Sequence, residues 1–490
     1  AVILGLLLRL YRLGYQSLWG DEALTIGKYA VGETAADVIA NVWQKALHPP
    51  LYFLVVHYSR PLGDSEFALR LPSVLFGVAS IPLLYMLAGR LFGRGAALAS
   101  AFLLALSPFH IWYSQEARMY SMTIFLALAG MLLFLRAWET GRARDFAAYF
   151  AVMVLGMYTH IAYVLVVASQ GVFVLGALLR DRGRSAPLVA AQALSLLAFL
   201  PWIVHVAARQ AGAADGPTIG FQREDNLLHL LYGFYTFAVG YSLGPTVASL
   251  HVISAGQAIR ANLPAILTPM LVFGALLIHG LLRSRRTNPI GSWFVIAHLL
   301  LPTTLVAAAA LIPGLPLNPR YLVSAAVPFW IFAAIGACAW ARPGALLSIP
   351  AAALLILGLS LSNHYLDPAR AKQDVRSAVR LINHQARPGD AIVISSVELG
   401  GPFEYYYRRP EVPYFGYPPR MGFVKPEKLS ADLDSLVKGR ERVWLILGRT
   451  WSSDPNGLIP AHFSRRHALV RETRFPGVTV SCFEITPSGG

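Results

Sequence analysis

Two adjacent acids, Asp21 and Glu22, follow the first apolar segment of a very hydrophobic chain. A charge near lipid is costly, and a protein that keeps one there usually uses it. A carboxylate at such a place can accept the proton of a hydroxyl group as a general base. The pair also has a purely structural explanation, because acids in the first turn of a helix starting near Ala23 are stabilised by the helix dipole. The two explanations are compatible.

Further polar side chains lie where other apolar runs begin or end, on the same predicted side of the membrane. They are His48, Gln115, Glu116, Arg118, Tyr120, His160, Arg320 and Tyr321. Arginine suits a phosphate leaving group because its planar guanidinium can donate two hydrogen bonds at once. An acid, cations and an apolar groove are together what a transfer from a lipid-phosphate sugar requires.

Each of these polar residues also has an ordinary structural explanation. Glu116 and Arg118 could form a pair at a helix start, and Arg320 with Tyr321 could anchor a helix at the headgroups. His48 precedes two prolines, where a turn residue is more common than a ligand, and His160 is interpreted as a satisfied interfacial histidine. The sequence contains no P-loop, no Rossmann glycine motif and no zinc-ligand spacing. The residues alone therefore support an enzyme and a transporter almost equally.

The composition identifies the elements that must hold these residues. The 490-residue chain is 56% hydrophobic and 14% charged, with a mean hydropathy of +0.52, whereas a soluble domain carries about 25% charge. We therefore expect a polytopic α-helical membrane protein. The net charge of +15 does not indicate nucleic acid, because most arginines lie in short loops between apolar runs, where they set topology. Cys338 and Cys482 lie in such different contexts that neither a disulfide nor a metal cluster is expected.

About eleven apolar runs are predicted to form transmembrane helices. They cover residues 1–13, 66–89, 95–112, 117–137, 146–160, 162–179, 187–207, 264–282, 291–311, 321–340 and 344–362. Because a span takes ~20 residues, the first run is expected to be the outer half of a helix that begins before Ala1. A signal peptide fits less well, since no small-residue cleavage site follows. Every second loop is rich in arginine, so by the positive-inside rule those loops are cytoplasmic, and the acid pair lies outside.

Two domains are predicted. Residues 1–365 form the transmembrane domain, with long outer loops at 20–65 and 208–263, the second interpreted as a mobile lid that bears a partly buried helix. Segment 371–490 is different in composition, with 17 of the 41 Lys and Arg residues and 12 of the 26 Asp and Glu residues. It is expected to be a small extracytoplasmic α/β domain.

Local patterns support this second domain. Residues 372–385 have helical spacing, and residues 391–396, 442–448 and 478–485 are typical of strands. The run Tyr405–Arg409 is interpreted as a half-buried strand end or a surface patch.

Several motifs carry a resemblance to a known family. They are Trp19-Gly20-Asp21-Glu22-Ala23, His48-Pro49-Pro50-Leu51-Tyr52, Glu66–Ser73, Ser107-Pro108-Phe109-His110, Ser114–Tyr120 and Asn318-Pro319-Arg320-Tyr321-Leu322. In order and spacing they resemble the bacterial family-39 glycosyltransferases, which are related to protein O-mannosyltransferases and to the lipid A aminoarabinose transferase and have the GT-C fold. The resemblance is dense over residues 15–140 and weak beyond residue 372.

The resemblance implies an inverting hexosyl- or pentosyltransferase that uses a polyprenyl-phosphate sugar at the outer face of the inner membrane. Asp21 lies where the family's catalytic acid of the first loop lies, so it is expected to be the general base, with Glu22 assisting or positioning the acceptor. The expected site for the donor phosphate and sugar comprises His48, Glu116, Arg118, Tyr120, Arg320 and Tyr321.

Departures from the family pattern limit what is carried over. The residue before Pro-Pro is often Lys or Glu in aminoarabinose-transferase-like members and is His48 here, so neither a Lys–phosphate contact nor a metal contact from Glu is expected. The first loop also lacks an Asp-x-Asp pair. No cofactor is therefore predicted, and a divalent metal is unsupported.

The expected partners are membrane lipids, a polyprenyl-phosphate-linked sugar donor and a lipid, protein or glycan acceptor; nucleic acid is not expected. The alternative function is a flippase or transporter of lipid-linked sugars without transferase activity. A transporter would place charges near the bilayer midplane and often shows internal repeats or broken helices. Here the charges lie at one outer boundary and no repeat occurs in the sequence, which favours the enzyme.

Overall fold

The computed structural model describes residues 1–178, 182–211, 226–311, 319–340 and 348–486. They belong to two compact units, and each is described by itself. The first unit contains residues 1–13, 29–245 and 255–366, and the second contains residues 14–28, 246–254 and 367–490. The predicted outer loop 20–65 is thus divided, and its first part groups with the C-terminal segment. Residues 212–225 of the predicted loop 208–263, and Asn318, lie outside the described residues.

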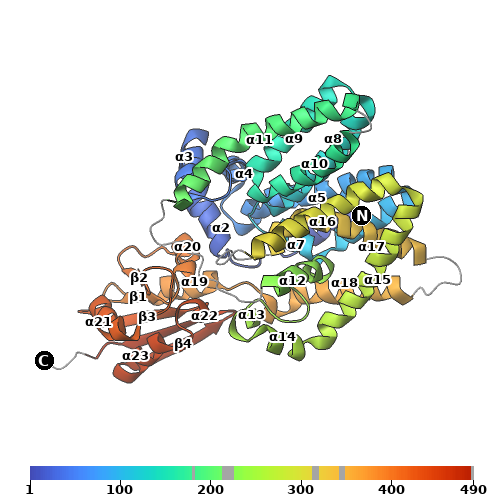
Figure 1. Cartoon of the computed structure of the whole chain (residues 1–490). Coiled ribbons are helices and arrows are strands. Elements are labelled where there is room, and N and C mark those ends of the chain that lie inside the picture. Colours follow the sequence, from blue (N-terminus) through green and yellow to red (C-terminus); the bar gives the residue numbers. More distant parts are fainter. Residues whose placement is uncertain (179–181, 212–225, 312–318, 341–347, 487–490) are drawn as a thin grey trace. The chain divides into compact units, whose positions relative to one another are not determined.

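The first unit is helical (Figure 1). Its helices are α1 (Val2–Leu10), α3 (Ala35–Lys45), α4 (Leu51–Ser59), η2 (Arg60–Leu62), α5 (Glu66–Phe92), α6 (Arg94–Leu106), α7 (Pro108–Ser114), α8 (Tyr120–Thr140), α9 (Ala143–Thr159), η3 (Ile161–Tyr163), α10 (Val164–Leu178), α11 (Arg182–Ala211), α12 (Asn226–Val239), α14 (Ala255–Ala261), α15 (Leu263–Thr287), α16 (Pro289–Ala310), η4 (Pro319–Ala325), α17 (Ala326–Trp340) and α18 (Ser348–Leu366).

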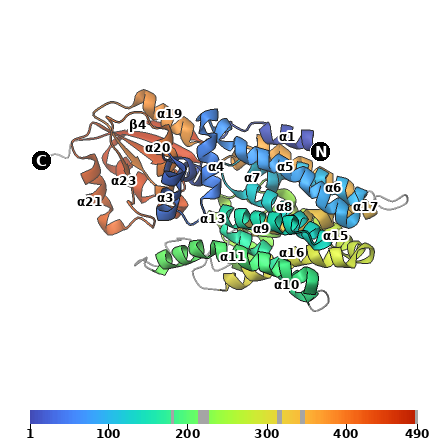
Figure 2. The same cartoon turned by 90° about the horizontal axis from the view of Figure 1, so that it is seen from above.

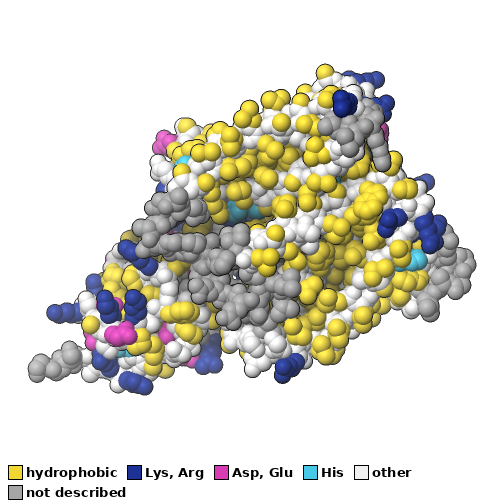
Figure 3. All heavy atoms as spheres, in the orientation of Figure 1, with side chains coloured by type: hydrophobic (Ala, Val, Ile, Leu, Met, Phe, Trp, Pro, Cys, Tyr) yellow, Lys and Arg dark blue, Asp and Glu magenta, His cyan; other side chains and the backbone are white. Residues whose placement is uncertain are grey.

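Within the described ranges, seven helices are long and apolar enough to cross a membrane. An eighth span results if α6 and α7, which are bent by 58° at their junction, are counted together. The other predicted runs also became helices, but α1, α9 and α10 have only 9, 17 and 15 residues, fewer than the ~20 that a span needs. The chain is a multi-pass membrane protein, and Figure 3 shows hydrophobic side chains covering the outward surfaces of α11, α15 and α16.

The bend between α6 and α7 follows from Pro108, which has no N–H to continue the helix. Ser107 caps α7 by accepting a hydrogen bond from the backbone N–H of His110 at 3.3 Å. The carbonyl groups freed at the end of α6 are bound by the buried Arg9, which donates to Leu104 O at 3.1 Å and to Ala105 O at 3.3 Å. Arg9 therefore fixes the break that ends near the predicted site motif at residues 115–118.

Close helix packing elsewhere depends on glycine. Helices α15 and α17 pack side by side (Figure 2), and a Cβ at Gly280 would lie 1.8 Å from Phe332 O, while one at Gly336 would lie 2.0 Å from Leu276 O. Small residues let helix backbones approach closely in membranes, where the hydrophobic effect does not drive helix association. These two glycines thus set the distance between the two helices.

The second unit is an α/β domain built on a five-stranded mixed sheet of order β2-β1-β3-β5-β4. Strands β1 and β2 and strands β1 and β3 pair in parallel, while β3–β5 and β5–β4 pair antiparallel. The strands are β1 (Ala391–Ile394), β2 (Tyr414–Gly416), β3 (Arg442–Leu447), β4 (Ala468–Phe475) and β5 (Val478–Glu484). The helices are α2 (Gly20–Leu24), α13 (Ser249–Val252), η5 (Pro368–Arg370), α19 (Val375–Gln385), α20 (Val397–Tyr406), α21 (Pro426–Val437), α22 (Thr450–Ser453) and α23 (Leu458–Arg466), and η1 (Thr25–Tyr29) follows α2 in the chain.

Helices cover both faces of this sheet (Figure 1). Alternate residues of β3 divide between the faces: Trp444 and Ile446 pack with α19 and α20, and Val443 and Leu445 pack with α21 and α23. The predicted helix and the three predicted strands are confirmed. The interpretation of Tyr405–Arg409 as a strand end is wrong, because Tyr405 and Tyr406 form the last turn of α20.

Candidate functional site

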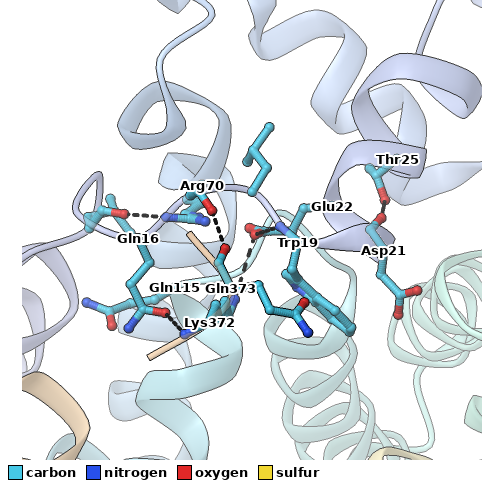
Figure 4. Close-up of polar contacts among 12 residues, drawn as sticks. Gln16, Trp19, Asp21, Glu22, Thr25, Arg70, Gln115, Lys372 and Gln373 are labelled. Carbon is cyan, nitrogen blue, oxygen red and sulfur yellow. Dashed lines mark hydrogen bonds and ion pairs between the residues drawn. The ribbon is translucent and has the colours of Figure 1, made fainter. Parts of the chain in front are cut away.

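The acid pair belongs to the second unit, in the first turn of the short helix α2. Glu22 is fully buried, accepts a hydrogen bond from the backbone N–H of Trp19 at 3.4 Å, and lies 3.7 Å from Lys372 Nζ. Asp21 is partly exposed, and its carbonyl oxygen accepts a hydrogen bond from Thr25 Oγ1 at 2.8 Å. The two carboxylates point in different directions (Figure 4). The pair therefore contains one buried, ion-paired acid and one partly exposed acid.

The predicted cations belong to the first unit, where Arg118 and Arg320 lie within electrostatic range of two histidines. The rings of His48 and His160 lie 4.6 Å apart between centroids, and the ring of Tyr120 lies 5.8 Å from that of His160. Arg118 is only 5% exposed and lies 5.9 Å from the centre of the Tyr120 ring. Four predicted residues, together with His160, thus form one basic and aromatic cluster.

Burial and positive charge keep both histidines neutral. Burial lowers the pKa of His160 to about 3, with further lowering from Arg118 and Arg320. Burial also lowers the pKa of His48 well below its usual range, with contributions from His160, Arg118 and Arg320. His160 Nδ1 accepts a hydrogen bond from the backbone N–H of Ala162 at 3.1 Å, so its proton is on Nε2. That buried Nε2–H meets no hydrogen-bond acceptor among the described residues, and it is a donor suited to a ligand.

The loop that carries Arg118 is held from both sides. Ser73 Oγ donates to the carbonyl oxygen of Arg118 at 3.1 Å and accepts from the hydroxyl of Tyr52 at 2.6 Å. Gln115 Nε2 donates to Arg9 O at 3.0 Å and to Tyr11 O at 2.9 Å. Hydrogen bonds therefore hold the backbone of the loop at Arg118, which limits how far its guanidinium can shift.

Glu116 and Tyr321, the remaining predicted site residues of this unit, lie near members of the cluster. Glu116 is buried, and its charge raises the pKa of Tyr241, although burial is the larger cause. Arg320 is partly buried in η4 and lies 6.0 Å from the centre of the Tyr321 ring. Both Glu116 and Arg320 act electrostatically on Tyr241, so each of them lies near that tyrosine.

Sequence reasoning undervalued one residue of the basic and aromatic cluster and missed the partner of Glu22. His160 was interpreted as a satisfied interfacial histidine, but its Nε2 is buried among groups of the cluster without an acceptor in the described part of the chain. Lys372, the partner of Glu22, was not singled out, because only the folded chain brings residues 350 positions apart together. Over the described ranges, no group of three or more His, Cys, Asp and Glu side chains could hold a metal ion.

Solved structures of membrane glycosyltransferases have the same fold. ArnT of Cupriavidus metallidurans in the apo state aligns with a TM-score of 0.59 and 14% identity, over 98% of this chain and 96% of ArnT. The oligosaccharyltransferase AglB of Archaeoglobus fulgidus, in complex with an inhibitory peptide and a dolichol-phosphate, aligns with a TM-score of 0.54 and 13% identity, over 98% of this chain and 73% of AglB. The chain has the GT-C glycosyltransferase fold.

Sequence comparisons agree with this GT-C fold over a shorter segment. Residues 47–205 match the family model described as dolichyl-phosphate-mannose-protein mannosyltransferase. The mannosyltransferase-like protein YycA of Bacillus subtilis is 26% identical over 190 residues, which is 38% of this chain and 27% of YycA. The chain thus matches only about a quarter of the length of that relative. The matched segment contains His48, Glu116, Arg118, Tyr120 and His160 but neither acid of the pair nor Arg320.

Proposed function

We propose that this GT-C protein is an inverting glycosyltransferase that moves a hexose or pentose from a polyprenyl-phosphate donor to an acceptor on the outer face of the inner membrane. The observation that carries the proposal is the basic cluster of Arg118, Arg320, His48 and His160. These side chains offer charged and neutral hydrogen-bond donors suited to a phosphate. The crystal structure of ArnT with undecaprenyl phosphate, whose TM-score with this chain is 0.54, supports a donor of this class.

In the proposed reaction, the acceptor hydroxyl attacks the anomeric carbon of the sugar. The hydroxyl proton passes to Asp21, a new bond forms between the acceptor oxygen and the anomeric carbon, and the bond from that carbon to the phosphate oxygen breaks. The electron pair of the broken bond leaves with the polyprenyl phosphate. Arg118 and Arg320 stabilise the negative charge that grows on this leaving group. Glu116 and Tyr120 shape the pocket for the sugar.

The assignment of Asp21 follows from the contrast within the acid pair. Glu22 is buried and ion-paired, whereas Asp21 is a partly exposed residue of a short helix. A general base must reach a proton on a bound substrate, which favours Asp21. We assign Glu22 the positioning role.

The test is transfer by the purified protein in lipid nanodiscs, supplied with undecaprenyl-phosphate-linked sugars and candidate acceptors. We expect Asp21→Asn to lower the turnover rate by at least about 100-fold, the usual lower value for a general base, while donor binding changes less than about threefold. The matched control is Glu33→Gln, which neutralises an exposed acid of the same predicted loop. Near-normal turnover by Asp21→Asn would contradict the assignment.

The same purified protein can be used to distinguish a transferase from a flippase or transporter. In proteoliposomes a transporter moves the lipid-linked sugar across the bilayer and forms no new glycosidic bond. A transferase yields the glycosylated acceptor and free polyprenyl phosphate in equal amounts, which mass spectrometry measures. Mass spectrometry of lipids that copurify with the protein identifies the sugar.

A further inference from the structure

The segment that carries the acid pair is bound tightly within the second unit. Ser17 Oγ donates to the carbonyl oxygen of Gln373 at 2.6 Å, and the backbone N–H of Leu18 donates to the hydroxyl of Tyr406 at 2.8 Å. The backbone N–H of Lys372 donates to Gln16 Oε1 at 3.2 Å. These hydrogen bonds attach residues 16–18 to the start and the end of the α19–α20 region. The segment just before Asp21 therefore has little freedom to move.

Helix α2 packs directly on α20. A Cβ at Gly20 would lie 3.2 Å from the carbonyl oxygen of Glu398, and a Cβ at Gly401 would lie 3.5 Å from Cβ of Ala23. The distance of 3.2 Å is tight for a side chain, so Gly20 permits a close approach of the α2 and α20 backbones. The orientation of α2, and with it the direction of Asp21, is thus set by a helix of the C-terminal domain.

The buried charge of Glu22 makes this attachment specific. Glu22 is fully buried, and Lys372, whose side chain is 10% exposed, lies 3.7 Å from its carboxylate. Lys372 Nζ also lies 5.6 Å from the centre of the Trp19 ring, so the lysine contacts both residues that flank the Gly20-Asp21 pair (Figure 4). Removing one partner of a buried ion pair leaves the other charge buried and uncompensated, which is strongly unfavourable.

We propose that the C-terminal domain is a working part of the transferase, and that Lys372 and Tyr406 are positioning residues for Asp21. Lys372 compensates the charge of Glu22, which becomes the anchor of α2, and Tyr406 fixes the backbone at Leu18. Asp21 is then the acid of the pair that acts on the substrate. This inference rests on the proposed role of Asp21 as the base.

The first experiment removes the charge of Lys372 in the full-length protein in nanodiscs. We expect Lys372→Met to lower kcat by about 100-fold, as small displacements of a catalytic group can do, while the KM for the donor changes less than about threefold. Lys372→Arg keeps the charge and should stay within about fivefold of the wild-type kcat. The matched control is Lys428→Met, which removes an exposed lysine of α21 in the same domain.

The second experiment separates charge compensation from general structural damage. If Lys372 acts through Glu22, the double variant Glu22→Gln with Lys372→Met should recover at least about tenfold in kcat over Lys372→Met alone, because the buried charge is gone. Tyr406→Phe removes a single hydroxyl and should lower kcat by about tenfold. Its control is Tyr407→Phe, which removes a hydroxyl that donates to Val412 O away from the 14–28 segment. Tyr406→Phe also keeps the test valid should Lys372→Met fail to fold.

The outcomes distinguish this inference from the proposed function. Normal kcat in both Lys372→Met and Tyr406→Phe would overturn the positioning role, even if Asp21→Asn is inactive. Failure of the double variant to recover would overturn charge compensation as the role of Lys372. Normal turnover by Asp21→Asn would instead overturn the proposed function itself.

Discussion

At the residue scale, the two arginines proposed to bind the donor phosphate differ in how exposed their side chains are. Arg118 is almost fully buried on a loop held by Ser73 and Gln115, whereas Arg320 is partly exposed in η4. Both lower the pKa values of His48 and His160, so all four groups share one electrostatic environment. In the proposed function, a donor phosphate bound there would accept hydrogen bonds from both arginines.

Truncation of either arginine should therefore weaken donor binding. A hydrogen bond to a charged group contributes about 1.5–3 kcal/mol, so we expect Arg118→Ala and Arg320→Ala to raise the dissociation constant of undecaprenyl phosphate by about 10- to 100-fold. Binding to protein in nanodiscs can be measured by native mass spectrometry. Arg144→Ala, at an exposed site near the start of α9, is the control. An unchanged dissociation constant in both variants would move the phosphate site elsewhere.

The buried histidines predict how stability depends on pH. The pKa of His160 is lowered to about 3, while an unfolded histidine titrates near ~6.5. Between these values the unfolded state binds more protons than the folded state, so stability rises with pH up to ~6.5 and is constant above it. As the pH falls below ~6.5, each such histidine should cost up to about 1.4 kcal/mol per pH unit.

Thermal unfolding between pH 7 and pH 5 measures this effect. The thermal midpoint of the wild type should decrease as the pH is lowered. The His160→Phe variant should show a smaller decrease per pH unit, because it lacks one group that must stay neutral in the folded state. His384→Asn, at an exposed position of α19, should leave the slope unchanged. Equal slopes in the wild type and His160→Phe would mean that His160 titrates normally in the folded protein.

At this scale the sequence identified candidate site residues better than it identified their hydrogen-bond and ion-pair partners. Charged residues at the ends of apolar runs drew attention to Arg118 and Arg320, because such placement is rarely accidental near lipid. The acceptor role of His160 Nδ1 depends on a backbone N–H two residues later in a 3₁₀ turn, which no pattern encodes. The pairing of Glu22 with Lys372 depends on how the C-terminal domain folds.

At the element scale, the contact of α15 with α17 gives a sharp test of packing. We expect Gly280→Ala and Gly336→Ala to lower the thermal midpoint, because each new methyl group would collide with a backbone carbonyl, and overpacking costs about 1–3 kcal/mol. Gly274→Ala is a matched control on the same helix, since nothing lies within 4 Å of a Cβ there. An equal change of the thermal midpoint in Gly274→Ala would show that the substitutions act through helix propensity and not through the contact between α15 and α17.

The prediction that the apolar runs form helices is confirmed, but several of these helices are too short to span a membrane. Length and hydrophobicity identify a helix, but run 95–112 contains Pro108, and the break there becomes visible only through the bend of 58° and the hydrogen bonds from Arg9. In the C-terminal domain the strands β1, β3 and β5 were predicted because their sequences are typical of strands. Strand β4 was missed because it is an edge strand whose residues Arg471, Glu472 and Arg474 carry no apolar alternation.

At the scale of the whole molecule, the second unit is assembled from three separate stretches of chain. Residues 14–28 and 246–254 join residues 367–490, so the C-terminal domain and the acid pair must lie on the same side of the membrane. The arginine-rich alternate loops predict that this side is outside. The position of one exposed residue of the domain therefore tests the location of the acid pair as well.

The substitution Lys428→Cys places a thiol on the exposed surface of α21. The native Cys338 is exposed and must be replaced by serine, whereas Cys482 is buried and burial raises its pKa to about 11, so it stays largely protonated and unreactive toward maleimides at neutral pH. We expect a membrane-impermeant maleimide to label the Lys428→Cys variant in intact spheroplasts. Arg142→Cys, in a predicted cytoplasmic loop, should react only after lysis. The reverse pattern would place the acid pair inside and exclude an extracytoplasmic transfer reaction.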